Sequence, residues 1–129
     1  MRPPLPPLPD EDLETFAQRL RVVADAAPVM LAYVDAQERF RYANTAYATW
    51  FNRPREALLG RTVREVAGDA AYEQLRPAVR VALAGQRVHF ERPVPSSGGP
   101  RCINATYVPH VQPDGCVAGY VSTVLDVTE

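Results

Sequence analysis

Apolar residues near the N-terminus recur every three or four positions. They are Leu13, Phe16, Ala17, Leu20, Val23 and Ala24. This period places them on one stripe of an amphipathic helix, which we expect over residues 10–27. The acidic residues 10–12 suit the positive end of the helix dipole, and Pro28 ends the helix. A stripe this narrow can pack on the domain or on a second copy of the chain.

After the first helix the pattern changes from helical to strand-like. Residues 29–35 and 39–44 are rich in Val, Tyr, Phe and Leu, and the polar segment 36–38 separates them. We therefore predict two strands joined by a turn. Asn44 is a favourable N-cap, because its side chain can accept a hydrogen bond from a backbone amide, and we expect a short helix over residues 45–51.

The middle of the chain contains residues that typically start and end helices. Pro54 marks a helix start, Gly60 a helix end, and residues 62–66 a further short turn. A longer helix is predicted over residues 70–84, with Gly85 as its terminator. The residues that this helix is expected to bury follow a four-residue spacing: Ala71, Leu75, Val79 and Leu83.

Three strand-like segments close the chain, at residues 86–94, 101–110 and 116–127. The connections 95–100 and 112–115 are rich in Pro, Gly, Ser and Asp, which favour tight turns, so the three segments are predicted to form two antiparallel hairpins. Two strands, several helices and three further strands together indicate an α+β domain, with an antiparallel sheet and helices on one face.

Composition limits the class of protein. The 129 residues are 47% hydrophobic and 22% charged, as in one soluble globular domain, and the net charge of −1 predicts no contact with nucleic acid or an anionic membrane. The longest apolar run, residues 26–34, is too short to span a bilayer. Without a secretory signal pattern, a cytoplasmic location is expected.

Two residue types are used unusually. Five of the 13 prolines lie in residues 1–9, MRPPLPPLP, which we interpret as a solvated leader outside the fold; its PxxP spacing leaves docking on an aromatic groove as the alternative. All 14 cationic residues are arginine. The absence of lysine excludes Schiff-base chemistry and a phosphate-loop lysine in this chain.

Four segments in order resemble the PAS sensory domain. They are Asp35 at the end of the first strand, residues 42–44 at the entry to the first short helix, FNRPREALLG at residues 51–60, and DVTE at residues 126–129. The resemblance covers residues 20–129. It implies a five-stranded antiparallel sheet in the order 2-1-5-4-3, with helices forming a cleft over it, in a PAS domain of residues 28–129.

The resemblance also implies a function. Such domains bind a small ligand or another protein and regulate an output domain, such as a histidine kinase of a two-component system or another signalling effector. The change is passed on through an N-terminal helix and the terminal motif, here Asp126 and Thr128. The helix stripe would then form a homodimer contact through Leu13, Phe16, Leu20 and Val23.

By the same resemblance, a ligand pocket would be lined from alternate strand positions and from the helices. The implied lining is Ala32, Val34, Val63, Val66, Val79, Leu83, Ile103, Ala105, Tyr107, Tyr120, Ser122 and Val124. It suits a small hydrophobic or aromatic ligand. The alternative is that these residues only fill the core, as we expect of Tyr47 and Trp50. Arg64 and Arg80 leave an anionic ligand open, although both also fit a solvated helix face.

No cofactor is identified by the sequence. In the flavin-binding light-oxygen-voltage subfamily a reactive cysteine stands where this chain has Val63, and a valine cannot form the thioether adduct. Ile103 and Val124 replace polar residues that contact the flavin there. Adduct chemistry is therefore not expected.

Haem and metal sites are not expected either. The long helix has no histidine to serve as an axial ligand, and pairing across the 95–100 turn places His89 opposite Thr106, away from His110. Cys102 and Cys116 lie about nine residues apart along their hairpin, roughly 30 Å at strand rise, so they cannot form a disulfide with each other.

Two other functions compete with ligand sensing. One is a ligand-free PAS domain that only dimerises. The other is a small cone-shaped isomerase, which would need a buried acid or base in its cavity. Asp35, Asp126 and His110 are the candidates, but no paired acid and base is evident, so an enzyme is not expected.

Overall fold

The computed structural model describes residues 13–95 and 98–128, apart from the side chains of residues 13, 14 and 16. The predicted leader at residues 1–9 and the side chains of Leu13 and Phe16 lie outside the described part of the chain. The predicted first helix is present as α1 (Leu13–Ala26), which ends two residues before Pro28 and one residue earlier than predicted.

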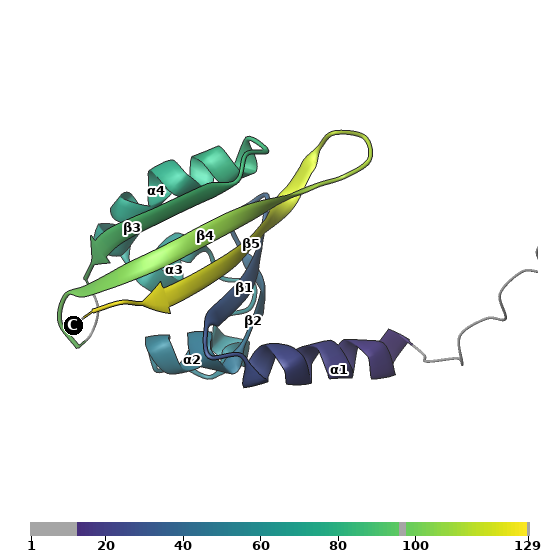
Figure 1. The fold of residues 1–129 in the computed structure, drawn as a ribbon, viewed down its shortest axis with the longest axis horizontal. Coiled ribbons are helices and arrows are strands. Elements are labelled where there is room, and N and C mark those ends of the chain that lie inside the picture. The colour runs from purple at the N-terminus through teal and green to yellow at the C-terminus, as the bar shows by residue number, and fades with distance from the viewer. Residues whose placement is uncertain (1–12, 96–97, 129) are drawn as a thin grey trace, which may run out of the picture.

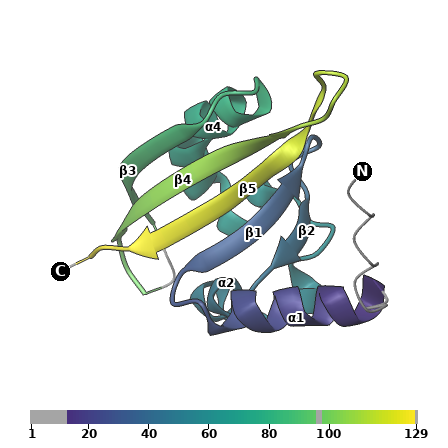
Figure 2. The same ribbon diagram turned by 45° about the vertical axis from the view of Figure 1, so that its right-hand side comes forward.

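The sheet has five antiparallel strands in the order β2-β1-β5-β4-β3, which confirms the predicted fold (Figure 1). Its strands are β1 (Met30–Asp35), β2 (Phe40–Ala43), β3 (Val88–Val94), β4 (Arg101–Val111) and β5 (Val117–Asp126). The helices α2 (Thr45–Phe51), α3 (Val63–Ala67) and α4 (Asp69–Leu83) lie on one face. Figure 2 shows α1 outside this layer, running past the end of α2.

Alternation along the strands separates a buried face from an open one. On β4 the side chains of Ile103, Ala105 and Tyr107 are buried, while those between them are only partly covered. The pairing Tyr107↔Ser122 continues the buried face onto β5. Because successive strand residues point to opposite faces, this buried row meets the helices.

The helix ends follow local sequence signals. Asn44 caps α2 as predicted, accepting a hydrogen bond from the Tyr47 amide at 3.2 Å. Residues 62–66, predicted as a short turn, instead begin the helix α3. The reason is a capping box, in which the Thr62 side chain accepts from the Glu65 amide and Glu65 bonds back to Thr62.

Strand β3 begins at Val88, two residues later than predicted, because the end of α4 uses the preceding residues. Gly85 adopts a φ of 94°, its amide donates to the Ala82 carbonyl, and the Gln86 amide donates to the Val81 carbonyl. These two bonds form a Schellman motif, which satisfies carbonyls that the helix end leaves free.

Candidate functional site

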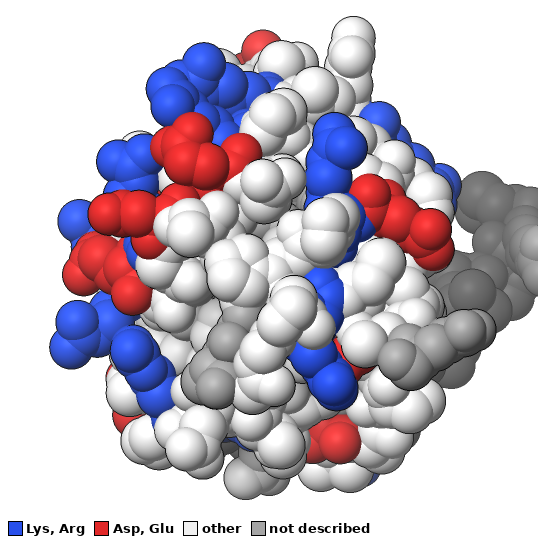
Figure 3. Space-filling model, turned by 90° about the vertical axis from the view of Figure 1, so that its left-hand side faces the viewer, with Lys and Arg blue, Asp and Glu red and all other residues white. Residues whose placement is uncertain are grey.

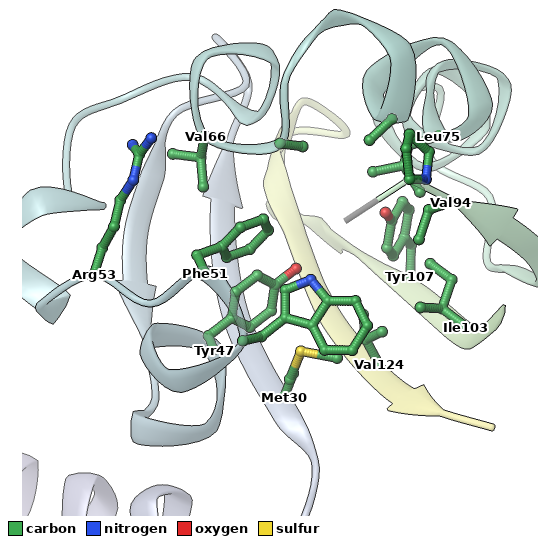
Figure 4. Close-up of a pocket in the computed structure, with 14 residues that line it drawn as sticks. Met30, Tyr47, Phe51, Arg53, Val66, Leu75, Val94, Ile103, Tyr107 and Val124 are labelled. Atoms are coloured by element: carbon green, nitrogen blue, oxygen red, sulfur yellow. The ribbon is translucent and has the colours of Figure 1, made fainter. Parts of the chain in front are cut away.

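A cavity of about 240 Å³ lies between the buried face of the sheet and helices α2, α3 and α4 (Figure 4). Strands β1, β3, β4 and β5 each contribute at least one side chain to its wall, and α2 contributes three aromatic side chains. Its lining consists of Met30, Tyr47, Trp50, Phe51, Arg53, Val66, Ala67, Ala71, Leu75, Val94, Pro95, Ile103, Tyr107 and Val124. Such a mainly apolar pocket is typical of sites for small molecules.

Helix α2 places three aromatic rings on the cavity. Tyr47, Trp50 and Phe51 stand at positions i, i+3 and i+4, so they share one helix face. The rings of Tyr47 and Phe51 stack with centroids 5.7 Å apart, and Phe40 meets Tyr47 edge-on at 5.6 Å. This cluster fixes the aromatic wall.

Two tyrosine hydroxyls give the cavity polar groups. The Tyr47 hydroxyl is 3.4 Å from the Ser122 Oγ. The Tyr107 side chain is buried, and among the described residues no group hydrogen-bonds to its hydroxyl. Burial raises the pKa of Tyr107 well above its usual value, so the hydroxyl stays protonated and can donate a hydrogen bond.

Arg53 is the one charged residue among those described as lining the cavity. It follows Asn52, which ends α2 in the left-handed conformation with a φ of 53°. The Arg53 side chain is exposed, and it pairs with no carboxylate in the described part of the chain. In Figure 4 it lies on the side of Phe51 and Val66, across from Tyr107 and Ile103.

A series of contacts links the cavity to the C-terminal end of β5. The Arg101 guanidinium lies over the Trp50 ring, 6.0 Å from its centroid, and its Nη2 is 2.6 Å from the Asp126 Oδ2. The Asp126 Oδ1 accepts from the Thr128 amide at 2.9 Å. The Thr128 Oγ1 in turn accepts from the Cys102 amide at 2.7 Å. A lining residue is thereby connected to the predicted exit motif.

Comparison with known families agrees with this architecture. A family model described as the PAS fold matches residues 24–129. The chain belongs to the PAS fold family. The resemblance drawn from the sequence is thus confirmed, whereas no curated protein matches the chain.

Solved structures show the same fold. The PAS domain of Bordetella pertussis BvgS is 26% identical, with a TM-score of 0.70 and 88% of each chain covered. A PAS domain from Colwellia psychrerythraea is 17% identical, with a TM-score of 0.72, over 88% of this chain and 98% of that one. Vibrio cholerae VqmA in a complex with ligand and DNA is 22% identical, with a TM-score of 0.70, over 92% of this chain and 52% of that one.

The PAS domain brings four of the predicted pocket residues to the cavity: Val66, Ile103, Tyr107 and Val124. The others do not line it. Most of them are buried in the surrounding core: Ala32, Val34, Val63, Val79, Ala105, Tyr120 and Ser122. Leu83 is half-buried and Arg80 is exposed. Whether any of these residues contacts a ligand remains a prediction.

Several lining residues were not predicted. Tyr47 and Trp50, which we expected in the core, pack there and also line the cavity. Their spacing with Phe51 on the short helix is the signal that could have indicated an aromatic wall. Arg53 carries no comparable signal, because its place at the cavity depends on how the chain leaves α2.

Arg80 lies instead in a separate surface groove with Arg64 and Arg76. Arg64 lies over the Tyr72 ring at 4.7 Å and pairs with Glu73 at 3.4 Å, and Arg76 pairs with the same carboxylate at 3.6 Å. The positive charge of two of these arginines is therefore largely balanced by neighbouring acids.

The histidines lie away from the cavity. His89 pairs with Thr106 as predicted, and its Nδ1 is 2.8 Å from the Thr106 Oγ1. The His110 Nδ1 is 2.7 Å from the Tyr33 hydroxyl. Among the described residues, no three His, Cys, Asp or Glu side chains gather in a way that could hold a metal.

The carboxylates considered as catalytic bases have structural partners. The Asp35 carboxylate accepts hydrogen bonds from the Gln37 amide, the Arg39 amide and the Arg41 Nε, at 2.9, 3.0 and 2.6 Å. Burial raises the pKa of Asp35, but these bonds outweigh it and hold the pKa below its usual value. Neither Asp35, Asp126 nor His110 lines the cavity.

The surface at the end of the molecule on the left of Figure 1 carries arginine and acidic side chains interspersed with one another (Figure 3).

No helix within the described residues has the length and apolar character needed to cross a membrane.

Proposed function

We propose that this PAS domain is a sensory module that binds a small molecule in the cavity between the sheet and helices α2, α3 and α4, and thereby regulates an output domain. The observation that carries the proposal is the cavity of about 240 Å³, with its apolar wall and a Tyr107 hydroxyl to which no described residue hydrogen-bonds. Close packing leaves few hollows of this size in a domain, and a polar group within an apolar hollow can orient a bound molecule. A bound ligand would fill the space and accept the Tyr107 hydrogen bond.

The output is proposed to respond through the end of β5. A ligand against Trp50 changes the position of the ring on which Arg101 rests, and Arg101 is bonded to Asp126. We propose a histidine kinase or another signalling domain as the effector, and only the family resemblance supports this choice. Cytoplasmic location remains a prediction from the lack of a secretory signal pattern. The absence of nucleic-acid binding remains a prediction from the net charge, and one solved structure of the same fold is of a protein in a complex with DNA.

Filling the cavity should abolish ligand binding without unfolding the domain. Ala71 is buried on α4 and lines the cavity, so Ala71→Leu places additional carbon atoms in the empty space. Ligand-stripped protein is mixed with each of a panel of small aromatic compounds, and its Tm is measured by thermal shift. A compound that binds should raise the Tm of the wild type by several degrees. A ligand at about 100 times its Kd stabilises by about 2.7 kcal/mol. Ala71→Leu should show no shift.

The neighbouring Ala70 is exposed on the same helix, which makes Ala70→Leu the matched control. This variant should respond like the wild type. If no compound shifts the wild type, or if Ala71→Leu still responds, the cavity is not the ligand site and the ligand-free alternative gains support.

Self-association is the second candidate function, and α1 favours it. Leu20, Val22 and Val23 expose 55%, 69% and 68% of their surface on this helix. Clustered exposed apolar side chains of this kind mark interaction sites.

The wild type should therefore sediment at twice the mass of one chain. Leu20→Arg combined with Val23→Arg should reduce the sedimentation mass to that of one chain. Leu59→Arg, which changes an exposed leucine outside α1, should leave the dimer intact; a monomeric wild type would contradict the proposal.

A further inference from the structure

We infer that the ligand of the cavity is a small aromatic monocarboxylate, with its ring against the α2 wall and its carboxylate at Arg53. This inference rests on the proposed ligand-binding function and adds the chemical class. Size comes first: an apolar cavity of about 150 Å³ can hold benzene, so the volume of about 240 Å³ leaves room for a benzene ring with a short substituent.

The wall selects for a ring. Four of the lining residues are aromatic: Tyr47, Trp50, Phe51 and Tyr107. Aromatic pairs gain from stacked and edge-to-face contacts beyond the area they bury, and the existing Tyr47–Phe51 stack shows that α2 already presents a ring face of this kind. A saturated ring of equal size would lose that gain.

The charge of the lining selects for an anion. Arg53 is the only ionised side chain among the described lining residues, and no described carboxylate pairs with it. No acidic side chain in the described lining could bind an amine. A guanidinium holds a carboxylate with two parallel hydrogen bonds, which a neutral amide cannot reproduce. The site therefore presents a cationic hydrogen-bond donor, which favours a ligand that accepts hydrogen bonds and carries negative charge.

The test uses the intrinsic fluorescence of Trp50, which is the only tryptophan in the chain and lines the cavity. The ligand-stripped 129-residue chain is titrated with phenylacetate and with three compounds of similar size: phenylacetamide, phenethylamine and cyclohexylacetate. Phenylacetate should bind about tenfold more tightly than the amide or the amine, as expected for a charge-assisted bond, and several-fold more tightly than cyclohexylacetate.

Arg53→Gln should reduce phenylacetate affinity about tenfold while leaving phenylacetamide affinity unchanged, and Arg53→Lys should recover part of the loss. Arg80→Gln is the matched control, because Arg80 is an exposed arginine of the separate groove. Equal affinity for acid and amide, or loss of acid preference in Arg80→Gln instead of Arg53→Gln, would overturn the assignment. So would a failure of phenylacetate to bind. The proposed sensory function would survive each of these results if the Ala71→Leu comparison still showed ligand binding.

Discussion

Replacing Gly119 with alanine should destabilise the domain by about 3 kcal/mol or more, among the largest effects of a single added methyl group. Gly119 lies on β5 opposite Asp35 of β1. A Cβ at this position would lie 2.9 Å from the Asp35 Cα and 3.0 Å from the Val34 carbonyl carbon, with the Val34 carbonyl oxygen the nearest atom. These are backbone atoms, which cannot rotate away, so β1 and β5 would have to separate. Urea unfolding followed by circular dichroism measures the loss.

Gly98→Ala is the matched control for this substitution. Gly98 is exposed, and a Cβ there would meet nothing within 4 Å. Its effect on the free energy of unfolding should remain within about 0.5 kcal/mol, as for most surface substitutions. Equal stability of Gly98→Ala and Gly119→Ala would show that the two central strands do not approach as closely as the structure indicates.

Local sequence signals were sufficient to predict most of the elements. The residue that caps α2, the bounds of that helix and the pairing of His89 with Thr106 all match the structure. Each depends on neighbours in the sequence: a capping side chain, an apolar period or a turn of known length. The strand order was implied by the family resemblance, since nothing in a local pattern states which strands lie side by side.

The lining of the cavity was predicted less well because strand alternation gives the face of a residue and not its depth. Ala105 and Tyr107 share the buried face of β4, yet only Tyr107 reaches the cavity. Ala105 is fully covered by neighbouring side chains. Which inner residue meets open space depends on where α2 and α4 cross the sheet, and that is set by packing between segments far apart in the sequence.

Asn44 combines a predictable role with an unpredictable one, and removing it should cost the domain about 3 kcal/mol or more. Its capping of α2 is visible in the sequence. Its Nδ2 also donates to the carbonyls of Ala24 and Val29, both at 2.8 Å, and its Oδ1 accepts from the Leu31 amide at 3.0 Å. The side chain is completely buried, so Asn44→Ala would remove all of these bonds at once and leave a small cavity in their place.

The variant Asn44→Asp separates the two roles of this side chain. A carboxylate can still accept from the Leu31 and Tyr47 amides, so the cap is kept, but it cannot donate to the Ala24 and Val29 carbonyls. If joining the end of α1 to the start of β1 is the main contribution, Asn44→Asp should be as destabilising as Asn44→Ala in urea unfolding. Recovery of wild-type stability in Asn44→Asp would instead assign the effect to capping alone. Asn104→Ala, which removes only an exposed 3.1 Å bond to Glu91, should cost less than about 1 kcal/mol and sets the scale for both.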